Sequence, residues 1–203
     1  MNAKRRVFED FAGDYDHWFD DHAKVYNAQL RLLGRALPST GHGLEIGVGS
    51  GRFAAPLGIR CGTDPSFPLA EMAKRRGVEV TIGTGEHLPY RSGSFDYVVM
   101  MTVICFLDDM AKVFREGFRV LVPSGIIMLG FIVRDGEIFR HYSAEPEKGR
   151  FLRHARFHSS EEVIQKIHEA GFSGVEVTTR EHGFCILTGK KEDFPRPMST
   201  NSF

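Results

Sequence analysis

Short apolar runs alternate with helix-like segments along most of the chain. Strands are predicted where roughly four to eight mostly apolar residues lie between turn residues, and helices where apolar residues recur every three or four positions. The predicted strands cover residues 44–47, 59–64, 78–83, 95–102 and 126–133, and the predicted helices cover residues 53–57, 65–76, 108–120 and 159–170. This alternation predicts right-handed crossovers and a parallel sheet with helices on both faces.

The end of the chain departs from this alternation. Residues 174–180 and 184–189 flank the tight turn Glu181-His182-Gly183 and predict an antiparallel hairpin. Residues 191–203 predict a loose tail. Because 203 residues are too few for two domains of ordinary size, we expect one α/β domain over residues 1–190.

Two segments are predicted to lie over the sheet. Residues 1–40 carry aromatic residues and leucines at helical spacing, which predicts two or three helices. Residues 134–157 have no clear period, and a loop of this length in a compact domain is usually either disordered or functional. We expect a helical flap at residues 1–40 and a substrate lid at residues 134–157.

The stretch Leu44-Glu45-Ile46-Gly47-Val48-Gly49-Ser50-Gly51 indicates a buried strand followed by a glycine-rich turn. Glycine at positions 47, 49 and 51 permits left-handed backbone angles and lets main-chain N–H groups approach a ligand closely. A helix from about Ser50 would point its positive N-terminal end at the same place. We therefore expect a ligand with polar groups at this loop.

The glycine spacing distinguishes between nucleotide-type ligands. A dinucleotide fingerprint reads Gly-x-Gly-x-x-Gly, whereas here the third glycine comes one residue early and Arg52 takes its place. The Gly-Lys-Ser or Gly-Lys-Thr ending of a phosphate-binding loop is absent from the sequence. The carboxylate of Glu45 suits a cationic ligand better than a pyrophosphate. An acidic residue followed by Gly-x-Gly-x-Gly resembles the first motif of class I S-adenosylmethionine-dependent methyltransferases, whose ligand carries an ammonium and a sulfonium.

Asp64 is a second acidic candidate. It ends the second predicted strand, a little under the roughly 20 residues after the loop at which a carboxylate meets ribose hydroxyls in nucleotide-binding α/β folds. An aspartate before Pro65 can also be simply a helix cap. Its place after the glycine loop and the second strand favours the ribose contact.

Later motifs extend the resemblance from about Tyr15 to Gly189. Tyr15-Asp16-x-Trp18-Phe19 resembles the segment before the fold in many small-molecule methyltransferases, and a Leu-Pro-Tyr turn at 88–90 followed by Phe-Asp at 95–96 resembles their adenine-binding region. Family members commonly have an aspartate at the position of Thr84, so either the Thr84 hydroxyl or Glu86 is expected to bond the adenine amino group.

The resemblance implies the fold, the cofactor and the reaction of this protein. The fold is a doubly wound, Rossmann-like sheet of seven strands in the order 3-2-1-4-5-7-6, with strand 7 antiparallel. The reaction is direct transfer of a methyl group to a small-molecule acceptor, which leaves S-adenosylhomocysteine, and the subgroup most resembled contains quinone-biosynthesis methyltransferases. The implied S-adenosylmethionine contacts are Tyr15, Trp18, Glu45, Gly47, Gly49, Gly51, Asp64, Pro65, Leu69, Thr84, Gly85, Glu86, Leu88, Met101 and Thr102.

A general base is required only where the acceptor must lose a proton. Candidates predicted to reach a lid-covered pocket are His141, His154 and, from the flap, His17 or His22, and the sequence favours none of them over the others. Two alternatives to the methyltransferase stay open: a regulatory protein that binds S-adenosylmethionine without transferring methyl groups, and a nicotinamide-dependent oxidoreductase, against which the early third glycine counts.

Charge and cysteine content narrow the range of binding partners and cellular settings that we expect. Lys+Arg and Asp+Glu both number 26, so no general basic field favours nucleic acid or an anionic membrane. The Asn/Asp-Pro-Pro-aromatic element of nucleic-acid amino-methyltransferases is absent after the fourth strand, which favours a small-molecule substrate. Three widely spaced cysteines and the lack of an apolar leader or long apolar segment indicate a reduced, cytoplasmic setting with no metal site.

Overall fold

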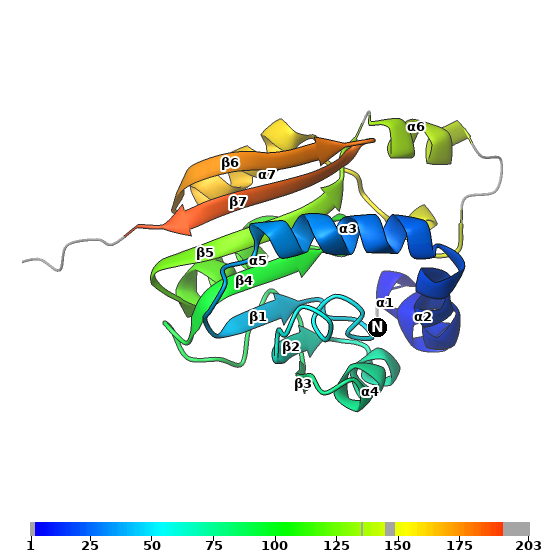
Figure 1. Cartoon of the computed structure of the whole chain (residues 1–203), viewed down its shortest axis with the longest axis horizontal. Helices are drawn as coiled ribbons and strands as arrows, with labels where there is room; N and C mark the ends of the chain where they lie inside the picture. The colour runs from blue at the N-terminus through cyan, green and yellow to red at the C-terminus, as the bar shows by residue number, and fades with distance from the viewer. Residues whose placement is uncertain (1–2, 135, 145–148, 193–203) are drawn as a thin grey trace, which may run out of the picture.

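The computed structural model describes residues 3–134, 136–144 and 149–192. Seven strands form one sheet in the order β3-β2-β1-β4-β5-β7-β6. Neighbouring strands are parallel except around β7, which runs antiparallel to both β5 and β6 (Figure 1). This confirms the predicted fold class. The strands are β1 (Gly43–Ile46), β2 (Cys61–Asp64), β3 (Glu79–Ile82), β4 (Phe95–Met101), β5 (Leu121–Ile132), β6 (Phe172–Glu181) and β7 (Phe184–Lys191).

Helices cover both faces of the sheet (Figure 1). On one face lie α3 (Ala23–Ala36) and α4 (Phe67–Arg75), and on the other lie α5 (Met110–Val120) and α7 (Ser160–Glu169). Successive β4 side chains alternate between the two cores, as strand geometry requires: Val98 packs on the α5/α7 side and Val99 on the α3/α4 side. The parallel strands are therefore buried on both faces, which explains their nearly continuous apolar sequences.

Local signals fix the ends of the helices and the hairpin. Helix α7 begins at a capping box, in which the Ser159 hydroxyl accepts from the Glu162 N–H and the Glu162 carboxylate accepts from the Ser159 N–H. The β6–β7 hairpin turns at His182 and Gly183, both with positive φ (49° and 86°), as a two-residue hairpin turn requires. The predicted helix start and hairpin are both confirmed.

The N-terminal part forms three helices. Helix α1 (Ala3–Asp10) and helix α2 (Ala12–Asp21) lie at the carboxyl ends of β1 and β2, and α3 then crosses the sheet (Figure 1). In the segment predicted as a lid, the structure has a regular helix, α6 (Glu137–Ala144), and a short 3-10 turn, η2 (Leu152–His154). Most of the predicted tail, residues 193–203, lies outside the described residues. None of the described helices has the length and apolarity needed to cross a bilayer.

One predicted element is wrong. Residues 53–57, expected to form a helix beginning near Ser50, form a succession of turns. Pro56 has no N–H to donate, and Gly58 has a φ of 72°, so only two helical contacts form, from the Ala55 N–H to the Gly51 oxygen at 3.0 Å and from the Leu57 N–H to the Phe53 oxygen at 3.4 Å. The glycine loop is consequently not backed by a helix dipole, and its N–H groups must act individually.

Candidate functional site

A cavity of about 390 Å³ lies at the carboxyl ends of the central strands, beneath α1 and α2. In open α/β sheets this edge, where the strand order reverses between β1 and β4, is where ligands bind. Twelve of the fifteen predicted contacts line the cavity: Tyr15, Trp18, Gly47, Gly49, Asp64, Pro65, Leu69, Thr84, Gly85, Glu86, Met101 and Thr102. The fold brings these distant segments together, and their role as cofactor contacts stays a prediction.

The glycine loop forms one wall of the cavity. Gly47 and Gly49 have φ angles of 74° and 52°. A Cβ at Gly47 would lie 2.4 Å from Cγ2 of Val103, and one at Gly49 would lie 3.3 Å from Cε1 of Tyr15. Both backbone conformation and space therefore require glycine at these positions. The Gly47 and Gly49 backbone therefore lines the cavity directly, with Tyr15 packed close to Gly49.

Asp64 lies at the end of β2 and is 7% exposed. Its Oδ2 accepts from the Gly49 N–H and its Oδ1 from the Ser66 N–H, both at 2.8 Å. Burial raises the pKa of the Asp64 carboxyl to about 6, although these hydrogen bonds oppose the increase. Each oxygen retains a further lone pair for a donor in the cavity. A pair of ribose hydroxyls fits this carboxylate.

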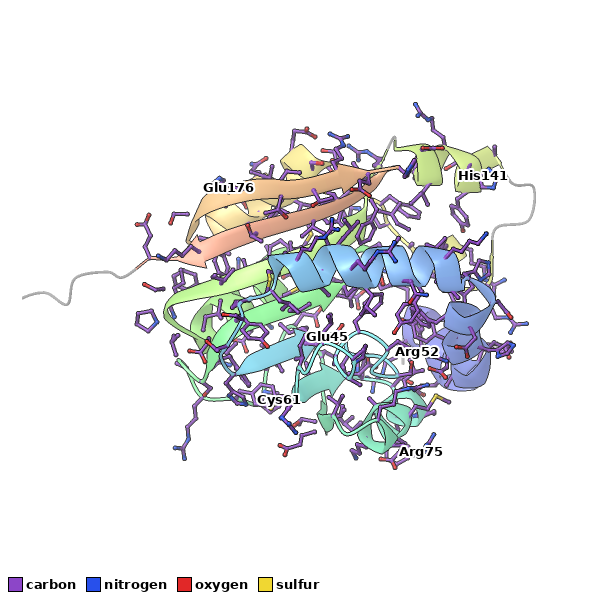
Figure 2. All side chains as sticks on the ribbon, viewed as in Figure 1. Glu45, Arg52, Cys61, Arg75, His141 and Glu176 are labelled. Carbon is purple, nitrogen blue, oxygen red and sulfur yellow. The ribbon has the colours of Figure 1, made fainter. Side chains whose placement is uncertain are left out.

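Three predicted contacts lie behind the cavity wall. Glu45 is 1% exposed beneath the loop, and its Oε2 has no hydrogen-bond partner among the described residues (Figure 2). Burial raises its pKa well above the usual range, although the Ala54 N–H opposes this. A Cβ at Gly51 would lie 3.0 Å from the Cα of Ala73 in α4, and Leu88 packs in the α5 core. Gly51 and Leu88 therefore contribute to packing, and Glu45 is an unpaired acid next to the loop.

The loop after β3 forms the far end of the cavity. Thr84, Gly85 and Glu86 all face it. A Cβ at Gly85 would lie 2.9 Å from Cγ2 of Ile46, so the backbone passes tightly over the end of β1. Glu86 Oε1 lies 3.5 Å from the Asp109 nitrogen. Both of the side chains proposed to bond adenine are therefore available at the cavity.

An aromatic cluster under the N-terminal helices was only partly predicted. The Phe8 ring of α1 lies 5.0 Å from Phe106, 5.3 Å from Phe151 and 5.4 Å from Tyr15. Burial raises the pKa of the Tyr15 hydroxyl far above its usual value, so this tyrosine stays neutral. Phe106 and Phe151 follow no periodic pattern, and only the tertiary fold brings them together. The cluster forms an apolar roof over the cavity.

An ion-pair network fastens this roof to the glycine loop. The Asp16 carboxylate of α2 accepts from Arg52 Nε at 3.0 Å and from Arg76 Nη2 at 2.8 Å, while Arg52 also pairs with Asp20. Burial raises the pKa of Asp16, but the hydrogen bonds from the two arginines outweigh that effect and lower it to about 2. Arg52, noted in the sequence only for breaking a dinucleotide pattern, joins α2 to the loop.

The ends of β4 and β5 supply the remaining wall. Met101 and Thr102 of the β4 end and Phe131 and Ile132 of β5 line it. Thr102 has a φ of 52°, rare for a β-branched residue, while its N–H donates to the Gly130 oxygen at 2.7 Å. Strained backbone of this kind is concentrated at functional sites. Burial raises the pKa of the Cys105 thiol to about 12, which agrees with a neutral, buried thiol rather than a nucleophile.

The structure does not place the predicted base candidates at this cavity. His17 lies 3.4 Å from Asp21 on the outer side of α2, and His22 stacks on Trp18. His141 is exposed on α6 at the periphery, and His154 Nε2 accepts from Arg153 (Figure 2). None of the four is among the described lining residues. The face of each helix that a histidine occupies depends on tertiary packing, which no local pattern in the sequence reveals.

A seven-stranded sheet of this order, with a glycine loop after β1 and a buried acid after β2 at one cavity, defines the class I methyltransferase architecture. A family model described as a methyltransferase domain matches residues 44–129. The chain is 40% identical over 172 residues to an uncharacterized protein of Methanocaldococcus jannaschii, covering 85% of this chain and 83% of that protein. It is 31% identical to the malonyl-[acyl-carrier protein] O-methyltransferase of Geobacter sulfurreducens, covering 85% and 71%.

A solved structure from Thermotoga maritima, described as an S-adenosylmethionine-dependent methyltransferase and possible histamine N-methyltransferase, superposes with a TM-score of 0.87. It is 36% identical, and the match covers 92% of this chain and 99% of that one. The chain belongs to the S-adenosylmethionine-dependent methyltransferases.

Proposed function

We propose that this protein uses S-adenosylmethionine to methylate a small-molecule acceptor by direct displacement. One observation carries the proposal: the same cavity is lined by the glycine loop, by Asp64 and by an apolar wall of β4 and β5. Its volume of about 390 Å³ falls within the usual range for small-ligand sites, roughly 300 to 1,000 Å³. The cavity therefore has polar lining for the cofactor and apolar lining for an acceptor of different chemistry.

Several of the predicted contacts have a defined task in this proposal. Asp64 accepts from the ribose hydroxyls, the Gly47–Gly49 backbone lies along the methionine part, and Thr84 or Glu86 with Leu69 holds the adenine. Glu45 lies beneath the loop, where the ammonium of the bound ligand would favour its ionised form. When bound, S-adenosylmethionine supplies an activated methyl group on a sulfonium.

The remaining residues align the acceptor and exclude water. Such alignment contributes roughly 7 to 11 kcal/mol in well-oriented systems. We assign the flap role to α1 and α2, because their aromatic side chains roof the cavity, and a lid role to the segment around Phe151, which packs against Phe8. Free Cys61, Cys105 and Cys185 fit the cytoplasmic setting expected from the sequence.

The relatives leave the attacking atom open, because one is named for O-methylation and another is described as a possible N-methyltransferase. Calorimetric titration with S-adenosylmethionine, S-adenosylhomocysteine, NAD and ATP tests the cofactor. Selective micromolar binding of the first two, about −8 kcal/mol, supports it, and binding of NAD alone overturns it. Production of S-adenosylhomocysteine with a panel of phenols, amines and carboxylates then tests transfer; tight cofactor binding without turnover would indicate a binding protein.

A variant pair makes the binding test specific. Asp64→Ala is expected to weaken S-adenosylhomocysteine binding by about 1 to 3 kcal/mol through loss of charged hydrogen bonds. Asp21→Ala removes an exposed carboxylate of α2 and is the control, with unchanged affinity expected. Equal affinity of both variants would remove Asp64 from the site.

A further inference from the structure

Gln29 is a buried polar residue on an otherwise apolar helix face. It lies in the middle of α3, three and four residues before Leu32 and Leu33, and shares their sheet-facing side. The residue is 7% exposed and lines the cavity. No described residue hydrogen-bonds its side-chain amide. Neither of its amide atoms is among the fully buried side-chain polar atoms without a partner, so the amide opens onto the cavity, where a bound ligand can reach it.

The position of α3 shows which part of the cavity Gln29 faces. The helix contacts β5 and β7 and crosses the sheet on that side, away from β2 and β3 (Figure 1). Asp64 and the Thr84–Glu86 loop, assigned above to the ribose and adenine, lie at the ends of β2 and β3. Gln29 therefore belongs with the β4 and β5 wall, where Met101, Phe131 and Ile132 leave an apolar surface.

Charge is distributed unevenly around the cavity. The charged residues among its described lining come from α1, the end of β2 and the loops after β3 and β4, and none comes from α2, α3 or β5: they are Lys4, Arg5, Asp64, Glu86 and Asp108. A charged group next to α3 would therefore lack a counter-charge there and would be disfavoured. A neutral amide, which both donates and accepts, matches an uncharged hydroxyl or carbonyl.

We propose that Gln29 determines acceptor specificity by hydrogen-bonding an uncharged hydroxyl or carbonyl on an otherwise apolar, aromatic-sized methyl acceptor. The inference rests on the proposed methyl transfer and adds the substrate class. The nucleophilic atom of the acceptor faces the methyl donor, and the end that carries the hydroxyl or carbonyl faces α3. The amide then forms a direct hydrogen bond only with an acceptor of the right chemistry, and polar groups in a binding site discriminate between similar ligands in this way.

The test uses two acceptors that differ in one group. 4-Hydroxybenzenethiol and 4-methylbenzenethiol have the same shape and both ionise readily, so neither depends on a base from the protein. The kcat/KM values for methylation are measured for the wild type, for Gln29→Met and for Gln165→Met. Gln165 is exposed on α7, where its Nε2 donates to Glu169 at 2.9 Å, and provides the matched control.

We expect the wild type and Gln165→Met to share one hydroxyl-to-methyl ratio of kcat/KM, and Gln29→Met to lower that ratio by about five- to tenfold, the value of one hydrogen bond. S-adenosylhomocysteine affinity should not change, and the melting temperature of Gln29→Met should not fall, because Met fills the same space without an unpaired amide. An unchanged ratio with active enzyme overturns the inference alone.

Two other outcomes also overturn it. Weaker S-adenosylhomocysteine binding by Gln29→Met would make Gln29 a cofactor contact. If the wild type binds S-adenosylhomocysteine but methylates neither thiol, the acceptor class is wrong, and the broader panel of phenols, amines and carboxylates decides separately whether methyl transfer itself fails.

Discussion

Replacement of Asp64 by asparagine should change how the stability of the protein depends on pH. Burial raises the folded-state pKa of Asp64 from its ordinary value of 3.8 to about 6. Below pH 3.8 the carboxyl is neutral in both folded and unfolded chains, so it carries no penalty. At higher pH the unfolded chain ionises this carboxyl easily, whereas the folded chain must ionise it in a buried site. The contribution of the neutral carboxyl to the free energy of unfolding is therefore lost as the pH rises through the folded-state pKa of about 6.

The size of the effect follows from the interval between the two pKa values. About 2 pH units at about 1.4 kcal/mol each give roughly 3 kcal/mol. The amide introduced by Asp64→Asn never ionises, so the unfolding free energy of this variant relative to the wild type should rise by roughly this amount between pH 4 and pH 7. Any offset from exchanging one carboxylate oxygen for an NH2 group is the same at each pH and does not affect this difference.

Urea unfolding, followed by circular dichroism at several pH values between these limits, measures the difference directly. Asp21→Asn, at an exposed carboxylate, is the control and should show no such trend. A constant difference between Asp64→Asn and the wild type across the range would refute the reasoning, because it would mean that the carboxyl titrates equally in the folded and unfolded chains.

Three further expectations concern the roof, the loop and a helix end. Asp16→Asn should lower the unfolding free energy by about 1 to 2 kcal/mol at pH 7, allowing for solvent screening of its contacts with Arg52; because the folded pKa is lowered from 3.8 to about 2, urea unfolding should show the loss disappearing as the pH falls through that interval. Gly49→Val should abolish calorimetric S-adenosylhomocysteine binding while circular dichroism stays native, since a side chain there meets Tyr15; normal affinity would refute the loop assignment. Ser159→Ala should reduce stability by about 0.5 to 2 kcal/mol through loss of the capping box, with no effect on cofactor affinity.

The sequence predicted best what local chemistry determines. Short β-rich runs, the helix start at Ser159 and the turn at Glu181-His182-Gly183 depend on neighbouring residues, and all three were found where expected. The glycine loop and Asp64 were predicted from their positions at the ends of two predicted strands. The carboxyl ends of parallel strands lie at the same edge of a sheet, so the meeting of these residues at one cavity could be predicted from the sequence.

The sequence could not predict contacts that depend on helix orientation. Gln29 resembles any surface glutamine until α3 is placed on the sheet. The histidines are the opposite case. Their side-chain chemistry suggested a general base, but the fold places His17 and His141 on the outer surface. The helix predicted after Gly51 does not form, although the apolar pattern of residues 53–57 favours one. Pro56 lacks the N–H that a regular helix requires at this position.

The ion pairs around the roof also bear on how quickly ligands exchange. Arg52 and Arg76 hold Asp16 of α2, and Lys4 of α1 lies 3.2 Å from Asp108 beside the cavity. Of these, the Lys4–Asp108 pair is the exposed one, and exposed pairs contribute only about 0 to 1 kcal/mol each. We expect ligand exchange under α1 to require this pair to separate. Salt screens such pairs over about 8 Å at physiological ionic strength. Release of S-adenosylhomocysteine should therefore accelerate as ionic strength rises, so that turnover is governed by the solvent around the roof as well as by chemistry beneath it.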